Sequence, residues 1–175
     1  MVVVDEAYGQ FAPSSALELD AKWRDRLVVV RTFSKTWALA GVRLGYAVSS
    51  PLVIAGASEA LLPYHLSSLT QLAGSLALDD LELMHQRVEA IVAGRNHLAQ
   101  AMADLDVEVT PSSANFILFR PRHRAASVVW SAMVAAGVLV RDCSSWPGLE
   151  NCLRVTIGTE AENAQFLIAL KEALA

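Results

Sequence analysis

Two short runs of β-branched residues constrain the fold of this chain most. The segments Val2–Asp5 and Leu27–Thr32 are almost wholly apolar and lack the alternation of a half-buried strand. Such runs are typical of fully buried strands in parallel sheets that carry helices on both faces. The polar segment from residue 12 to 26 is helix-capable and suits a crossover between parallel strands. The sequence therefore predicts an α/β fold for this part of the chain.

The rest of the chain divides at a long helical pattern over residues 80–104, whose apolar residues recur at helical spacing. A boundary near residue 90 gives two expected domains, 1–90 and 91–175. Before the boundary we expect a further strand at 44–48 and helices at 51–62 and 67–78. After it, we expect an α+β module. Its strands are predicted at 107–110, 116–120, 138–141 and 153–157, and its helices at 125–136 and 160–174.

Composition excludes several classes of function. A net charge of −4 and a pI near 5.5 argue against a general attraction to nucleic acid. Although 54% of the residues are hydrophobic, no apolar run reaches the ~20 residues of a membrane span, and no secretory leader precedes the first strand. We therefore expect a cytoplasmic protein that binds small molecules. The two cysteines, Cys143 and Cys152, are expected to be reduced packing residues.

A buried strand at residue 2 needs neighbouring strands, because a strand without partners forms no stable sheet. The chain therefore looks like the second half of a larger enzyme.

Lys35 is the strongest candidate for chemistry. A lysine that acts as an amine nucleophile must be partly deprotonated, which a dry environment and a nearby cation promote. Lys35 follows a predicted buried strand and lies eight residues before Arg43. The plainer alternative is a strand-end lysine that extends its amine into water.

Asp5 ends the first strand and Tyr8 lies three residues farther on, at the edge where open parallel sheets bind ligands. A carboxylate there could keep a pyridine nitrogen protonated, although a turn or helix-capping role is the alternative for Asp5. Ser34 and Arg43 supply a hydroxyl and a guanidinium, which suit a phosphate dianion.

The order Asp5, Tyr8, Ser34-Lys35 and Arg43 resembles the pyridoxal-phosphate-dependent aminotransferases of fold type I. The resemblance implies that Lys35 is catalytic and holds the aldehyde of pyridoxal 5'-phosphate, and that the other four residues bind the cofactor. It also implies that residues 1–90 are the C-terminal part of a cofactor-binding large domain with a mostly parallel sheet. Residues 91–175 would then form the small α+β C-terminal domain.

Arg154 lies inside a predicted strand, where an unpaired charge is costly, so we expect it to meet an anion. An internal ion pair with Glu150 is the alternative. Arg141 ends the preceding strand. Together with Ser113–Phe116, Pro147–Leu149 and Leu153–Thr159, these arginines resemble the histidinol-phosphate aminotransferase family. The resemblance implies that Arg141 and Arg154 bind substrate, namely histidinol phosphate or glutamate and 2-oxoglutarate. It further implies a homodimer that serves histidine biosynthesis.

Other functions remain open at this point. Aromatic-amino-acid aminotransferases and threonine-phosphate decarboxylase share most of these motifs. An apolar strand that ends in Asp5-Glu6 also resembles the Walker B element of P-loop ATPases, although the chain has no GxxxxGK[ST] loop. In the aminotransferase family, the phosphate loop, the aromatic residue that stacks on the cofactor ring and the N-terminal arm all lie upstream of the segment that matches Asp5. An inactive fragment that acts only by association is therefore another alternative.

Overall fold

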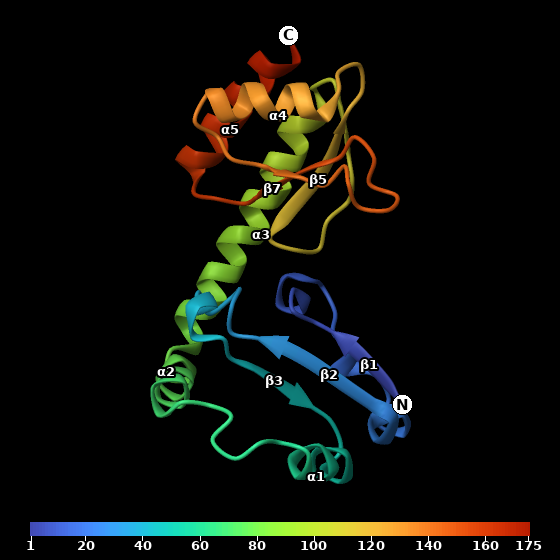
Figure 1. Cartoon of the computed structure of the whole chain (residues 1–175), viewed down its shortest axis with the longest axis vertical. Helices are drawn as coiled ribbons and strands as arrows, with labels where there is room; N and C mark the ends of the chain where they lie inside the picture. Colours follow the sequence, from blue (N-terminus) through green and yellow to red (C-terminus); the bar gives the residue numbers. More distant parts are fainter. The chain divides into compact units, whose positions relative to one another are not determined.

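The computed structural model describes residues 1–175, apart from the side chain of Ala21. The chain divides into two compact units, Met1–Val88 and Glu89–Ala175, each with its own sheet. The long helix α3 (Leu81–Ala103) begins in the first unit and ends in the second (Figure 1).

The first unit contains a three-stranded sheet in the order β1 (Val2–Asp5), β2 (Leu27–Thr32) and β3 (Gly45–Val48) (Figure 1). Strands β1 and β2 are parallel, and β3 returns antiparallel to β2 with Gly45 opposite Thr32. A side chain at Gly45 would lie 2.8 Å from the carbonyl oxygen of Arg31, so this pairing requires glycine. The three predicted strands are present.

The expectation that both early strands are fully buried is wrong for β1. Val29 at the centre of β2 is fully buried, whereas Val2 and Val3 are 59% and 63% exposed. Among the described residues, β1 pairs only with β2 and forms the edge of the sheet. Its side chains therefore have few neighbours to pack against.

The crossover contains three short 3₁₀ helices, Gly9–Phe11, Ala16–Glu18 and Ala21–Arg26, rather than one α-helix. The side chains of Ser15 and Asp20 each accept a backbone N–H and start a new turn, which divides the segment.

Helices α1 (Pro51–Glu59) and α2 (Ser68–Leu78) follow β3 and agree with the predicted positions. The core of this unit centres on Phe33, Trp37 and Met84. The rings of Phe33 and Trp37 stack with their centres 5.4 Å apart. This packing holds the segment after β2 against the start of α3.

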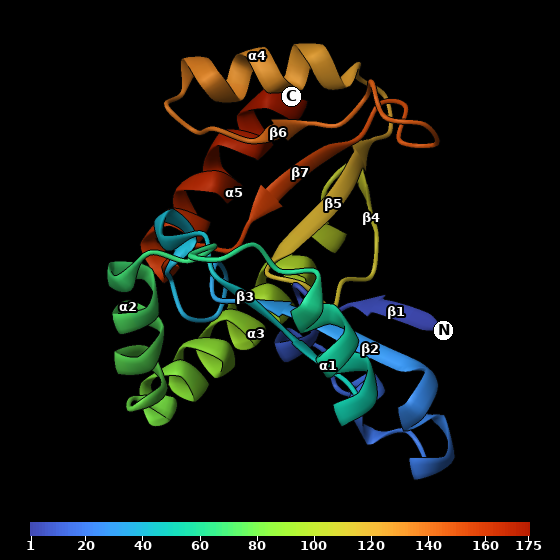
Figure 2. The same cartoon turned by 60° about the horizontal axis from the view of Figure 1, so that its bottom comes forward.

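The second unit is an antiparallel sheet in the order β4-β5-β7-β6, with β5 and β7 side by side at its centre (Figure 2). Its core combines side chains from α3, from the sheet and from the helices α4 and α5, among them Leu98, Ile117, Phe119, Val129 and Leu170. The bounds are Val107–Val109 for β4, Phe116–Pro121 for β5, Arg141–Asp142 for β6, Leu153–Thr156 for β7, Ala126–Ala135 for α4 and Glu160–Leu174 for α5.

The strand predicted at 138–141 is shorter than expected and comprises only Arg141 and Asp142. The start of the predicted strand instead belongs to the turn that ends α4. In this turn Gly137 adopts a left-handed conformation with φ of 79°. The Val138 N–H then donates to the Met133 carbonyl at 2.9 Å. This helix-ending motif removes the start of the predicted strand.

Candidate functional site

The predicted residues of the first unit gather where β1 and β2 end. Asp5 is the last residue of β1 and lies opposite Val30 of the parallel strand β2, which ends two residues later at Thr32. Ser34 and Lys35 follow directly. Both strands thus end at the same edge, the edge at which parallel sheets bind ligands.

Lys35 and Tyr8 are in contact. The Lys35 Nζ lies 5.1 Å from the centre of the Tyr8 ring, and both side chains are half-buried. An ammonium group over an aromatic face is attracted to it by roughly 0.5–1 kcal/mol at exposed sites. The structure therefore brings the candidate amine and the candidate phenol together.

Asp5 is exposed, and its Oδ1 accepts the N–H of Ala7 at 2.9 Å. The carboxylate closes a turn at the end of β1, so the turn role considered from the sequence is present. Within the described residues, Asp5 lacks the buried environment expected for a carboxylate that keeps a pyridine nitrogen protonated.

Ser34 and Arg43 lie at the two ends of one loop. The N–H of Phe33 donates to the carbonyl of Leu44 at 3.0 Å, which closes the loop around residues 34–43. Arg43 is exposed, adopts a left-handed conformation with φ of 56°, and its Nη1 donates to the Ala40 carbonyl at 3.1 Å. Ser34 and Arg43 thus each adjoin one of the two residues whose backbones are paired at the base of the loop.

Glu6, to which the sequence gives a role only in the ATPase alternative, is a buried residue. Its side chain is 8% exposed and its Oε2 accepts two hydrogen bonds from Arg31, at 2.8 Å from Nη2 and 3.1 Å from Nε. It also accepts the Ser15 hydroxyl and the N–H of Ala16. The parallel register could have predicted the pair, because Glu6 and Arg31 each follow the paired residues Asp5 and Val30.

Burial raises the pKa of Glu6, but the hydrogen bonds from Arg31, Ala16 and Ser15 together lower it below its ordinary value. Burial also disfavours the charged form of Arg31 and so lowers its pKa. The contacts of Arg31 with Glu6 and Tyr46 outweigh this effect and raise the pKa above its ordinary value. The ionised Glu6 carboxylate is therefore engaged by these donors. This structural role disfavours the ATPase alternative, in which that glutamate would activate water.

In the second unit, Arg141 of β6 lies directly opposite Arg154 of β7. The Arg154 guanidinium is 4.8 Å from the centre of the Phe116 ring, and its Nε is buried without a hydrogen-bond partner. Two like charges opposite each other destabilise a sheet, so this arrangement favours a bound anion.

The alternative ion pair between Arg154 and Glu150 is absent from the described part of the chain. Glu150 instead accepts the N–H of Gly148 at 3.2 Å. Arg120 of β5 donates a hydrogen bond to the backbone carbonyl of Glu150. Its guanidinium also forms an ion pair with the Glu108 carboxylate at 3.6 Å. Arg120 thus has a carboxylate partner, in contrast to Arg154.

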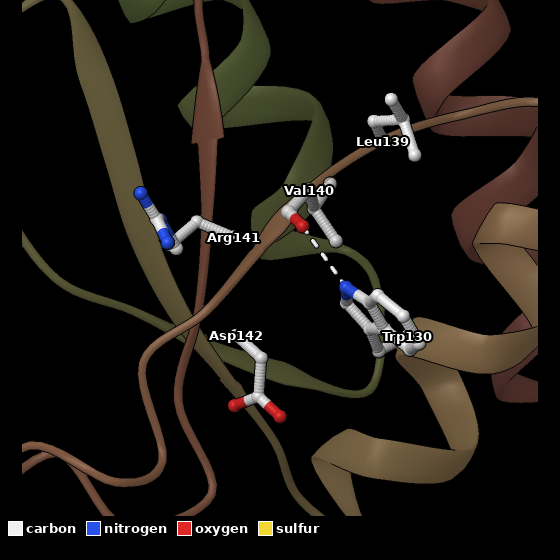
Figure 3. A pocket seen from close by; sticks show the side chains of 5 residues that line it. All are labelled: Trp130, Leu139, Val140, Arg141 and Asp142. Atoms are coloured by element: carbon white, nitrogen blue, oxygen red, sulfur yellow. Dashed lines mark hydrogen bonds between the residues drawn. The ribbon is translucent and has the colours of Figure 1, made fainter.

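A pocket of about 500 Å³ flanks β6 and is lined by Trp130, Leu139, Val140, Arg141 and Asp142 (Figure 3). The Trp130 indole donates to the carbonyl of Val140 at 3.0 Å and holds that residue beside α4. Arg141 extends away from Trp130 in this view, while Asp142 lies on the other side of the strand (Figure 3).

Across the residues that the structure describes, no helix is long and apolar enough to cross a membrane. No cluster of three or more histidine, cysteine, aspartate or glutamate side chains that could hold a metal ion occurs among them. The candidate chemistry rests on the lysine, the arginines and their neighbours.

Comparison with known protein sequences gives a match over most of the chain. Residues 1–170 match the family described as aminotransferase class I and II. The chain is 42% identical over 170 residues to a histidinol-phosphate aminotransferase of Mycobacterium avium. This match covers 97% of the chain but 42% of the relative, so the chain spans less than half the length of that protein.

Two solved structures are similar over nearly the whole chain. Histidinol-phosphate aminotransferase from Sinorhizobium meliloti, in complex with pyridoxal-5'-phosphate, has a TM-score of 0.81 and 28% identity over 98% of this chain and 48% of that one. L-threonine-O-3-phosphate decarboxylase from Porphyromonas gingivalis has a TM-score of 0.85 and 26% identity over 98% of this chain and 54% of that one.

Proposed function

Because this chain belongs to the class I and II aminotransferases, we propose that it forms the C-terminal part of a pyridoxal-phosphate-dependent transaminase that acts on histidinol phosphate. The observation that carries the substrate assignment is the cross-strand pair of Arg141 and Arg154, in which a buried Nε lacks a partner. In this proposal residues 1–90 belong to the large cofactor-binding domain, and residues 91–175 are the small α+β domain.

The residues at the ends of β1 and β2 fit the groups of pyridoxal phosphate in chemical type. Lys35 offers an amine for the aldehyde, and Tyr8 a hydroxyl for the phenolic oxygen. Ser34 and Arg43 offer donors for the phosphate, and Asp5 a carboxylate for the ring nitrogen. The contact of Lys35 with Tyr8 and the closed loop that joins Ser34 and Arg43 support this set.

When bound, pyridoxal phosphate supplies an electron sink for the substrate's α-carbon. The Lys35 Nζ moves the proton at that carbon, and the adjacent Tyr8 ring orients the amine. The exposed Asp5 carboxylate balances the positive charge of the ring nitrogen.

Arg154, with Arg141 opposite it, binds the anionic end of each substrate. The phosphate of histidinol phosphate occupies the pair in one half-reaction, and a carboxylate of glutamate or 2-oxoglutarate in the other. The Phe116 ring lies against the Arg154 guanidinium, and the N–H groups at the edge of the guanidinium plane donate to the anion. We further propose that the enzyme is a cytoplasmic homodimer in histidine biosynthesis.

The cofactor role is tested by borohydride reduction after incubation with pyridoxal phosphate, followed by peptide mapping. The label is expected on Lys35 and absent from Lys35→Ala. Recovery on Lys22 or Lys171, the other two lysines of the chain, would contradict the assignment.

The substrate role is tested by kcat/KM for histidinol phosphate, histidinol and phenylalanine in a protein that also contains the upstream half of the family's fold. Arg154→Ala is expected to lose roughly 2–5 kcal/mol of binding to the phosphorylated substrate. Arg120→Ala is the matched control, because that arginine is paired with Glu108. A preference for phenylalanine, or no effect of the phosphate, would overturn the substrate and leave the transaminase.

A further inference from the structure

Cys143 and Cys152 lie opposite each other at the end of the β6–β7 ladder. Asp142 is paired with Leu153, and the N–H of Cys143 donates to the carbonyl of Cys152 at 3.0 Å. This single bond places the two cysteines opposite each other directly beyond the ladder, while the N–H of Cys152 donates to the carbonyl of Leu149. Residues directly opposite in an antiparallel ladder project from the same face, so the two side chains are neighbours.

The cysteine pair shares its face of the ladder with the arginine pair. Side chains alternate along a strand, so Cys143 projects with Arg141 and Cys152 with Arg154. Burial raises the pKa of the Cys143 thiol, while the charges of Arg154 and Arg141 lower it in part. The effect of both arginines on the pKa of Cys143 is consistent with a thiol that lies beside the two guanidiniums.

We propose that Cys143 and Cys152 are a dithiol site that closes to an intramolecular disulfide and thereby fixes the edge strand β6 to β7. Opposed residues of antiparallel strands have Cα atoms about 4.5–5.5 Å apart, inside the roughly 4.4–6.8 Å range of disulfides. The Cβ atoms of opposed residues lie about 4.5–5.5 Å apart and those of a disulfide about 3.5–4.5 Å, so closure needs rotation of the side chains and draws the ends of the two short strands slightly together. The structure contains both cysteines as free thiols, which is the reduced form.

The oxidant is a small disulfide such as oxidised glutathione. Cys152 is 4% exposed and Cys143 fully buried, so the thiolate of Cys152 attacks the small disulfide first and releases one small thiol. The Cys143 sulfur then displaces the second small thiol and forms the protein disulfide. The two cysteines lose two electrons and two protons, and the small disulfide is reduced to two thiols.

The consequence follows from the size of β6, which is a two-residue strand at the sheet edge. Short edge strands open readily, because one side of their backbone has no partner in the sheet. A covalent link at the next residue pair limits this opening. It therefore holds Arg141 in register with Arg154.

The test incubates the whole chain with oxidised glutathione and measures its intact mass after acid quenching and alkylation. Closure predicts a loss of about 2 Da, for two hydrogens, and no alkylation at either cysteine. Cys143→Ser and Cys152→Ser each remove closure and are expected to stop at a single glutathionyl adduct or to stay unmodified. Hydrogen exchange at residues 141–143 is expected to slow in the oxidised wild-type chain.

Two results would overturn the proposal, and both come from the wild-type chain, so they do not depend on the folding of a variant. One is a chain that stays reduced, or stops at the glutathionyl adduct, under conditions in which the unfolded chain closes its disulfide. The other is a disulfide that forms without slowing exchange in β6. Neither result bears on the transaminase proposal.

Discussion

Replacing Glu6 by glutamine isolates the contribution of the buried ion pair to the stability of the first unit. The side chains of Glu6 and Arg31 are only 8% and 16% exposed. Glutamine keeps the size of the side chain and an oxygen that accepts from Ser15 and Ala16, but it removes the negative charge. Arg31 is then left partly buried without its counter-ion.

Removal of one partner from a buried pair costs about 3–5 kcal/mol. Because the amide keeps some hydrogen bonds, we expect the lower end of this range, about 3 kcal/mol, which is more than a hundredfold in the folding equilibrium. Replacing both partners with apolar residues, as in Glu6→Leu with Arg31→Met, should recover much of the loss.

The loss should depend on pH. The pKa of folded Glu6 lies below its ordinary value of 4.5, so the charged carboxylate stabilises the fold fully above that pH. The contribution disappears as the pH falls through the lowered folded pKa. The difference between wild type and Glu6→Gln is therefore expected to shrink below about pH 4.5.

Urea titration with hydrogen exchange in β2 measures the stability of the first unit alone. Glu82→Gln is the matched control, because it is the same substitution at an exposed site on α3 and should change the stability by less than about 0.5 kcal/mol. The reasoning is refuted if both variants lose the same free energy, or if the loss in Glu6→Gln is as large at pH 3 as at pH 7.

Three further outcomes are expected. Gly9→Ala should destabilise the first unit by about 1–3 kcal/mol in urea unfolding, because the new Cβ would lie 2.7 Å from the Cβ of Glu6, and an unchanged stability would contradict this. Asn151→Ala should cost about 2–3 kcal/mol and speed hydrogen exchange at the start of α4, since the Asn151 side chain accepts the N–H of Ala126 and donates to the carbonyl of Pro121; equal exchange in both proteins would contradict this. Asp5→Asn, in a protein with the upstream half present, should lower kcat on the order of a thousandfold while the cofactor stays bound, and near-normal turnover would refute the proposed role of Asp5.

Local patterns in the sequence were enough to predict most elements. The final helix occupies the predicted residues, Glu160–Leu174, because Thr159 and Glu162 form a capping box that marks its start and an apolar face follows. The strands β1 and β2 and the loop that carries Lys35 also follow from short runs of residues. In each case the information lies within a few neighbouring positions.

Contacts between distant segments were decided only by the tertiary structure. The bonds of Glu6 to Arg31 depend on the register of two parallel strands, and the pairing of Arg141 with Arg154 depends on that of β6 with β7. The end of α4 likewise removed part of a strand that local propensity favoured. Propensity and periodicity act over one or two turns of chain, whereas strand register is fixed by packing across the whole sheet. The sequence therefore determined the candidate residues, and the fold decided which of them face each other.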